Sequence, residues 1–362
     1  MSAGFLDTYE KVRYLYEKNY EIRFCRTDEV ECLIEFIDRY WQKNHIFTKC
    51  RELLDWQHYD RVRDRYNFVL AIERQTQEIH GVIGFIMSSI YDEKIETPIR
   101  WGAIWKVRED VGTKGLGIAL KYFLEKNVPA PYVGGVGLSR FSKEINEKLE
   151  EEVGRLELYY MLNSYKKDYF LVGNYEQISF EKPGADRKEK KGFVNVSREE
   201  FQDGDKVYFS QIPSYKSPEY YVRRYFEHPI YRYHFTEIWG EDSPGACFIW
   251  RFCEHEGYRC IVIVDFLGKA EAMAGHYDNF QKLLKETGAE YISFYNIGLE
   301  EQCFYQGGFK KRSDSDIIIP VYYEPFLKQN VELDYHYIAK PGTAEEKLIF
   351  KGDADQDRPN QL

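Results

Sequence analysis

The chain has 362 residues, of which 43% are hydrophobic and 17% are aromatic. This length and apolar content predict about two domains with packed cores. The net charge of −10 argues against a general nucleic-acid-binding protein, because neutralising phosphates requires a basic face.

The sequence also argues against a membrane-spanning protein, a protein with a signal peptide and a metal-binding protein. The sequence contains no run of 18 apolar residues, so we expect no membrane span. Its first 24 residues lack the apolar core of a signal peptide, which favours a cytoplasmic protein. The seven cysteines form no C-x-x-C pair, and we interpret them as reduced and mostly buried. No His, Cys, Asp or Glu cluster has metal-ligand spacing, so we expect no metal site.

The first half predicts alternating strands and helices after a lead-in helix over 1–19. Apolar residues at helical spacing predict a helix at 27–43, and alternation predicts the strand at 100–107. The predicted strands cover 20–25, 66–74, 80–90, 100–107, 131–139 and 155–162, and the predicted helices cover 27–43, part of 44–60, 116–126 and 143–153. A charged segment at 181–192, which contains Pro and Gly, predicts a linker or an exposed loop.

The second half repeats this rhythm of elements. The predicted strands cover 246–253, 258–268, 289–297 and 316–323, and the predicted helices cover 217–239 with a break at Pro229, 275–288 and 299–309. The fold class is therefore α/β, with mixed sheets in two domains of similar plan. We expect a first domain at 1–180, a second at 193–340 and a flexible tail at 341–362.

A glycine-rich loop precedes one helix, in the stretch EDVGTKGLGIALKYFL at 109–124. Glycines at a helix start let backbone amides approach a phosphate. A Walker A loop is excluded, because no Lys-Ser or Lys-Thr pair follows the last glycine. A dinucleotide fingerprint is disfavoured, because the preceding strands look antiparallel and no acidic residue ends the next strand. A tight strand–helix turn with no ligand stays open as the structural alternative.

An alternating strand, this loop and the helix together resemble the acyl-CoA site of the GCN5-related N-acetyltransferase (GNAT) superfamily. Gly115 and Gly117 match the family pattern, whereas Gly112 stands where the family has Arg or Gln. The resemblance covers 20–172 and implies a GNAT fold with acyl-CoA as cosubstrate and no permanently bound cofactor. The residues that it assigns to CoA are Ile104, Trp105, Lys106 and Val107 on the strand, and Gly112, Thr113, Lys114, Gly115, Leu116 and Gly117 in the loop and helix start.

The second half lacks such a loop, but YNIGLEEQCFYQGGF resembles the C-terminal segment of the same family. The matching residues are Asn296, Tyr305, Gly308 and Phe309. The chain therefore resembles a tandem GNAT protein, in which the first half binds CoA and the degenerate second half shapes the acceptor site.

The segment at 41–59 combines aromatic and polar side chains, which suits a sugar or a base. Its residues Trp41, Asn44, His45, Trp56 and Gln57 are the predicted acceptor-binding residues. The segment resembles dTDP-amino-sugar N-acyltransferases that use 3-hydroxybutanoyl-CoA. The resemblance implies a dTDP-3-amino-3,6-dideoxyhexose as acceptor, in the synthesis of surface polysaccharide such as the O-antigen of lipopolysaccharide.

The amine must lose a proton during transfer, so a base or a water relay is expected. The candidate bases are His45, Asp55 and Asp265, and Tyr305 is the candidate acid for the leaving thiolate. Each of these side chains has an alternative structural role. Two other functions remain open: an aminoacyl-tRNA-dependent peptidoglycan branching transferase, which the negative charge disfavours, and a non-catalytic ligand-binding module.

Overall fold

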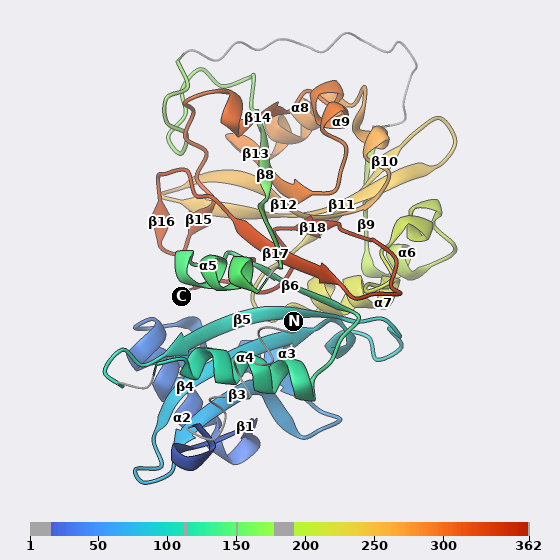
Figure 1. Ribbon diagram of the computed structural model, residues 1–362. Coiled ribbons are helices and arrows are strands. Elements are labelled where there is room, and N and C mark those ends of the chain that lie inside the picture. Colours follow the sequence, from blue (N-terminus) through green and yellow to red (C-terminus); the bar gives the residue numbers. More distant parts are fainter. Residues whose placement is uncertain (1–15, 112–113, 150, 177–191, 361–362) are drawn as a thin grey trace.

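The computed structural model describes residues 16–111, 114–149, 151–176 and 192–360. Two mixed sheets of eight strands each lie one above the other (Figure 1). The first sheet has the order β1-β3-β4-β5-β6-β17-β7, and β2 pairs with β3 at its side. Its strands are β1 (Tyr20–Arg26), β2 (Tyr59–Asp60), β3 (Arg65–Glu73), β4 (Ile79–Met87), β5 (Ile99–Val107), β6 (Tyr132–Val136), β7 (Glu152–Arg155) and β17 (Asp334–Ala339).

The second sheet follows the same plan, with the order β14-β8-β13-β12-β11-β10-β9 and β18 beside β13. Its strands are β8 (Glu157–Leu162), β9 (Gly192–Val196), β10 (His234–Trp239), β11 (Pro244–His255), β12 (Tyr258–Gly268), β13 (Tyr291–Ile297), β14 (Lys310–Lys311) and β18 (Ile349–Phe350). A separate small ribbon pairs β15 (Tyr322–Tyr323) with β16 (Phe326–Leu327). The α/β class with two similar mixed sheets is thus as the sequence predicts.

Helices cover both faces of the first sheet. The apolar sides of α2 (Val30–Phe36) and α3 (Arg51–His58) pack on one face, and α4 (Leu116–Asn127) packs on the other. Figure 1 shows α4 lying across β3 and β4, and α5 (Arg140–Lys148) lying near β17. The remaining helices are α6 (Arg198–Gln202), α7 (Pro218–Tyr221), α8 (Tyr277–Thr287) and α9 (Glu301–Gln306).

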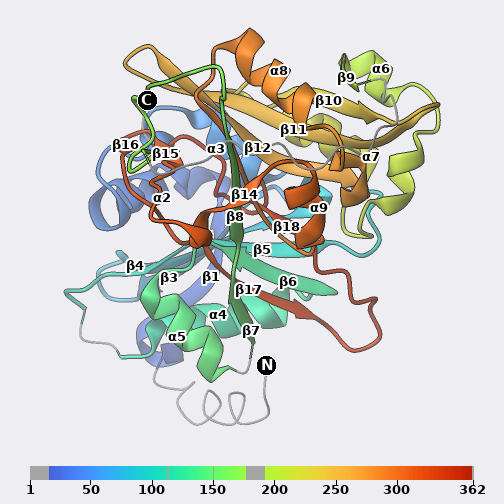
Figure 2. The same cartoon turned by 90° about the horizontal axis from the view of Figure 1, so that it is seen from above.

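The two halves of the chain exchange a strand. Strand β17, from the second half, lies between β6 and β7 in the first sheet, and β8, from the first half, lies between β13 and β14 in the second. Figure 2 shows β17 near β6 and β7, and Figure 1 shows β8 near β13 and β14. The expected division into 1–180 and 193–340 is therefore corrected, because each sheet needs a strand from the other half of the chain.

The predicted flexible tail at 341–362 is also corrected, as far as residue 360. Strand β18 pairs with β13, and the side chains of Asp353 and Asp357 are fully buried. Asp353 lies 2.9 Å from Lys216 Nζ, and Asp357 lies 2.9 Å from an Arg251 guanidinium nitrogen. Buried charges require such partners, so these ion pairs hold the segment in place.

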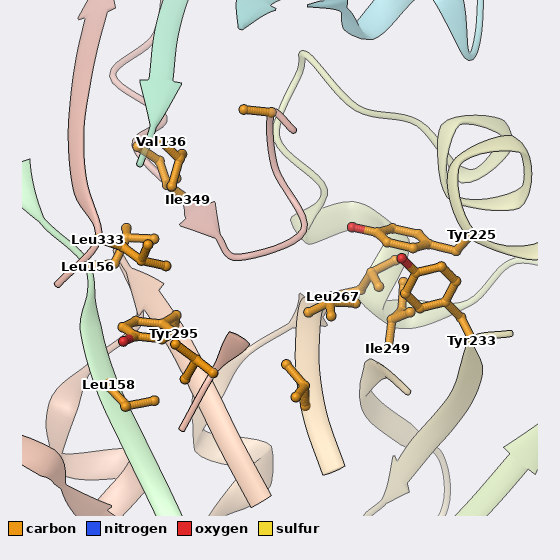
Figure 3. Packing of buried hydrophobic residues seen from close by; sticks show 14 of the residues in the cluster. Val136, Leu156, Leu158, Tyr225, Tyr233, Ile249, Leu267, Tyr295, Leu333 and Ile349 are labelled. Atoms are coloured by element: carbon orange, nitrogen blue, oxygen red, sulfur yellow. The ribbon is translucent and has the colours of Figure 1, made fainter. Parts of the chain in front are cut away.

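The largest apolar cluster joins the two sheets, which makes the molecule one packed unit. It contains Val136 from β6, Ile249 from β11 and Ile349 from β18, all buried (Figure 3). Many of its members are tyrosines, which explains the high aromatic content noted above.

Most predicted elements of the first half are found, with one boundary corrected. The helix predicted at 143–153 ends at Lys148, and β7 follows it. In the second half, the helix predicted at 217–239 ends before Pro229, and His234–Trp239 is a strand. Aromatic and β-branched residues favour a strand there. The strand predicted at 316–323 is reduced to β15 and one bridge at Ile318, whereas β17 and β18 were not predicted.

Within the described part of the chain, none of the helices is both long enough and apolar enough to cross a membrane.

Candidate functional site

The parallel strands β5 and β6 separate after three paired positions. The pairing runs from Ile99↔Tyr132 to Trp101↔Gly134, after which β5 continues beside β4 alone. A cleft of about 840 Å³ opens where the strands part, and α4 and α5 contribute to its walls. A ligand in this cleft would lie against the backbone edge of β5 that faces β6.

A bulge in β5 lies next to this opening. Ile83 pairs with Trp105 and Phe85 pairs with Gly102, so two residues of β5, Ala103 and Ile104, oppose Gly84 alone. A bulge takes backbone groups out of the regular ladder. Amides of β5 at this point are therefore suited to bind a carbonyl group of a ligand.

The glycine loop meets the same cleft at the start of α4. Gly115 is the N-cap of α4 with φ of 84°, in the left-handed region that glycine adopts without strain. The first helical amides have no partner within the helix, and the positive end of the helix dipole lies there. Gly117 faces Trp105, because a Cβ atom at 117 would lie 3.3 Å from the indole nitrogen. Of the predicted CoA residues, Gly112 and Thr113 lie outside the described residues.

Other predicted CoA residues line the cleft as well: Ile104, Trp105, Lys106, Val107, Gly115, Leu116 and Gly117. Lys114 is adjacent, and its carbonyl accepts a hydrogen bond of 2.9 Å from the Tyr16 hydroxyl. Although the chain carries a charge of −10, the cleft is lined by five Lys or Arg residues and three Asp or Glu residues. Each of the five cations also lies within ion-pair distance of a carboxylate, so these side chains are already partly neutralised.

The second sheet contains an equivalent parallel pair, but its opening is filled. Strands β12 and β13 also pair over three positions, from Ile261↔Ile292 to Ile263↔Phe294. Beyond them, β18 pairs with β13, and the Gly352 amide donates a 2.8 Å hydrogen bond to the Val264 carbonyl. The C-terminal strand thus occupies the place where the first sheet has its cleft.

A buried polar cluster lies at the inner wall of the cleft, and the sequence did not predict it. Lys121 of α4 lies 2.8 Å from a Glu151 carboxylate oxygen and donates a 3.1 Å hydrogen bond to Asn146. His336 of β17 lies 2.9 Å from the other carboxylate oxygen. Lys121, Asn146 and His336 line the cleft. Lys121 and Asn146 are polar residues in predicted helices, where the sequence favours exposed side chains. Strand β17 was not predicted at all.

His45 does not have the surroundings of a general base. Its ring is fully buried outside the cleft, and Nδ1 accepts a 3.2 Å hydrogen bond from the Phe47 amide. Burial, with the nearby Arg358 and His58, lowers the pKa of His45 to about 2. The imidazole is therefore a neutral structural group that caps the short helix Ile46–Thr48.

The other three acid–base candidates also lie outside the cleft. Asp55 is half exposed, accepts a hydrogen bond from Tyr66 and pairs with Arg51 at 2.7 Å. Asp265 is fully buried beneath the second sheet's opening and lies 2.9 Å from Lys216. The Tyr305 hydroxyl donates a hydrogen bond to Glu301 on the exposed side of α9. The structure therefore places all four expected catalytic residues outside the cleft, and their catalytic roles stay predictions.

Among the predicted acceptor residues, Trp41 lines the cleft and is 41% exposed. Asn44 is exposed in a turn with φ of 57°. Trp56 donates to the Arg223 carbonyl at 3.4 Å, between the two sheets, and Gln57 is buried. The structure thus brings Trp41 to the cleft and leaves Asn44, His45, Trp56 and Gln57 outside it. In the described part of the chain, no three His, Cys, Asp or Glu side chains are placed to hold a metal ion.

No protein-family model and no curated protein matches the sequence. Among solved structures, a GCN5-related N-acetyltransferase from Anabaena variabilis ATCC 29413 is similar with a TM-score of 0.50 at 8% identity, over 88% of this chain and 72% of that chain. A GCN5-related N-acetyltransferase from Kribbella flavida gives a TM-score of 0.51 at 10% identity, over 89% of this chain and 71% of that chain. At these identities the likeness concerns the fold, and so the chain has the fold of the GCN5-related N-acetyltransferases, with two sheets of that plan in one polypeptide.

Proposed function

We propose that the protein is an acyl-CoA-dependent N-acyltransferase whose donor binds between β5 and β6. The observation that carries this proposal is the contrast between the two sheets. The opening beside β5 is a cleft of about 840 Å³ at the start of a glycine-capped helix, whereas β18 fills the opening beside β12.

In this proposal each part of acyl-CoA meets a group suited to it. The pyrophosphate lies at the N-terminus of α4, where Gly115 and Gly117 leave room for close approach of the backbone. The pantetheine arm, which carries two amides, pairs with the free edge of β5 over Ile104–Val107. The thioester then lies near the bulge and the point where β5 and β6 part.

The reaction is direct attack of a neutral amine on the thioester carbon. Amides of the bulge at Ala103 and Ile104 would bind the carbonyl oxygen and stabilise the negative charge that develops on it. The chain's own groups would exclude water and hold the amine within reach, which lowers the entropic cost of the encounter.

For the acceptor, we propose an amino sugar linked to a nucleotide, of the dTDP-3-amino-3,6-dideoxyhexose type, used in surface polysaccharide synthesis such as that of the O-antigen. Trp41 offers an exposed indole for stacking on a sugar or base. Gln42, Gln356, Arg358 and Asn360 line the same cleft and offer hydrogen bonds to hydroxyl or phosphate groups.

A screen of acyl-CoAs against nucleotide-linked amino sugars tests this function, with release of free thiol as the readout. We expect thiol release that depends on both the acyl-CoA and the amino sugar, and no release with the corresponding hydroxy sugar. CoA binding without release for any amine would instead support the ligand-binding module. Release with a different class of amine would keep the acyltransferase and refute the sugar acceptor.

A further inference from the structure

The exchanged strand β17 carries a histidine to the inner wall of the cleft. His336 pairs in register with Gly135 of β6, and a Cβ atom at residue 135 would lie 2.7 Å from His336 Nε2. Gly135 therefore leaves the space that the imidazole occupies. Since Trp101↔Gly134 is the last pair between β5 and β6, the ring stands beside the point where these strands part.

A carboxylate and a lysine lie beside this ring. Nδ1 of His336 lies 2.9 Å from one oxygen of Glu151, whose other oxygen lies 2.8 Å from Lys121 Nζ. The side chains of these three residues are all at least nine-tenths buried. Nδ1 and this oxygen are not aligned as a hydrogen bond, but the negative charge of Glu151 favours the tautomer that carries its proton on Nδ1. Nε2 then carries the lone pair, and among the described residues it has no hydrogen-bond partner.

We propose that His336 moves the proton during acyl transfer, and that Glu151 is its positioning residue. This inference rests on the proposed function, because it requires an acyl-CoA thioester between β5 and β6. It gives the second half of the chain a direct part in the chemistry of the first, through the strand that it contributes.

The step balances in atoms and charge. The amine nitrogen forms a bond to the thioester carbon, and the C–S bond breaks. Nε2 of His336 accepts the proton that the nitrogen loses and delivers it to the sulfur, so the products are an amide and free CoA thiol. Lys121, which also lines the cleft, offers a positive charge to the sulfur while the thiolate forms.

Burial keeps the His336 ring neutral at physiological pH. Burial lowers the pKa of His336, Lys121 lowers it further, and Glu151 and Glu125 oppose this. Its strand neighbours, Gly135 of β6 and Val153 of β7, carry no charge. Near helix α5, Asn146 is uncharged, and Lys143 is paired with Asp334 at 3.0 Å. A neutral imidazole is the form that accepts a proton.

The first test replaces the ring, with His336→Gln compared with His255→Gln, a partly exposed histidine of β11 in the second sheet. We expect His336→Gln to lower kcat by roughly 10²–10⁴-fold, the usual worth of general acid–base catalysis. Stabilisation by CoA in a thermal shift should be retained, which establishes that the variant is folded. The acidic limb of the kcat profile, with a midpoint below pH 6.5, should disappear. His255→Gln should behave as the wild type.

The second test is Glu151→Gln, which removes the negative charge beside Nδ1. A positioning role predicts a lower kcat together with a shift of the acidic limb to lower pH, because Glu151 raises the pKa of His336. In ¹⁵N NMR of histidine-labelled full-length protein, wild-type His336 should show the Nδ1–H tautomer. The Gln variant should lose this preference.

Failure of this inference can be distinguished from failure of the proposed function. Wild-type protein that neither binds CoA nor releases thiol would refute the function itself. Wild-type activity with an unchanged kcat and an unchanged acidic limb in His336→Gln would overturn the role of His336 alone.

Discussion

At the scale of single residues, Gly117 lines the cleft in the first turn of α4. A side chain there would point at Trp105 and into the space assigned to the pyrophosphate. We predict that Gly117→Trp abolishes the increase in melting temperature that CoA gives the wild type. Gly240→Trp is a matched control, because a Cβ atom at 240 meets its nearest neighbour at 3.6 Å and the residue lies outside the cleft. Equal CoA stabilisation of both variants would refute the assigned pyrophosphate site.

Glu151 predicts a specific dependence of stability on pH. Although burial raises its pKa, the nearby His336 ring and the charge of Lys121 lower it, to about 2 from 4.5. A lowered folded-state pKa gives stability that is present above pH 4.5 and is lost as the pH falls towards 2. We predict that Glu151→Gln lowers the unfolding free energy by about 3 kcal/mol at pH 7, and that this difference shrinks as the pH falls to 2.

Urea unfolding at a series of pH values measures this difference. Glu147→Gln, at an exposed position on α5, should change the unfolding free energy by less than about 0.5 kcal/mol at every pH. A Glu151→Gln difference that stays constant between pH 7 and pH 2 would show that the carboxylate is not held by these partners.

Of the site residues predicted from the sequence, the loop glycines Gly115 and Gly117 line the cleft, whereas the acid–base candidates do not. The role proposed for Gly115 and Gly117 depends on their lack of a side chain, and the structure places both at the cleft. His45 and His336 are the same residue type, but only the tertiary fold determines that the first is enclosed by Phe47 and His58 and the second faces a cleft. The C-terminal residues Arg358 and Asn360 also lie close to this segment, and such contacts distant in the chain are not encoded by the local sequence.

At the scale of elements, the exchanged strands make each sheet depend on both halves. We predict that a fragment of residues 1–180 does not fold cooperatively, because it lacks β17 and leaves β6 and β7 without the strand between them. Co-expression with a fragment of 192–362 should restore a cooperative thermal transition, followed by circular dichroism. A cooperative transition of the 1–180 fragment alone would mean that the exchange is dispensable.

The C-terminal strand depends on a buried lysine. Lys216 lies 2.9 Å from both Asp265 and Asp353, and all three side chains are buried. We predict that Lys216→Met lowers the unfolding free energy by about 3–5 kcal/mol, because it leaves two buried carboxylates without a cation. Lys282→Met, at a 69% exposed side chain of α8, should cost less than about 1 kcal/mol in the same denaturant titration. Equal effects of the two substitutions would contradict the role of the buried pair.

Periodicity predicted the elements of the first half, because each strand and helix there carries its own apolar pattern. It failed for β17 and β18, which are short and are stabilised by neighbours far away in sequence, such as β6 and β13. The segment His234–Trp239 belongs to the helix predicted at 217–239, whereas pairing with β9 and β11 makes it a strand.

At the scale of the whole molecule, the same sheet topology occurs twice, but the opening between the parallel strands forms a cleft in one sheet and is filled in the other. The first opening is a cleft, and the second is filled by β18 and sealed by the Lys216 ion pairs. The sequence indicated a repeat and the loss of the glycine loop from the second half. It did not indicate that the C-terminal strand β18 fills the opening between β12 and β13, because that depends on how the two sheets pack together.

Hydrogen–deuterium exchange with and without CoA tests most directly the claim that CoA binds the first sheet and not the second. We predict that CoA slows amide exchange at 102–107 of β5 and in the first turn of α4 after Gly115. Exchange at 264–268 of β12 and 295–297 of β13 should stay unchanged, because β18 already covers these strands. Protection confined to β12 and β13, or no protection in either sheet at saturating CoA, would contradict the account.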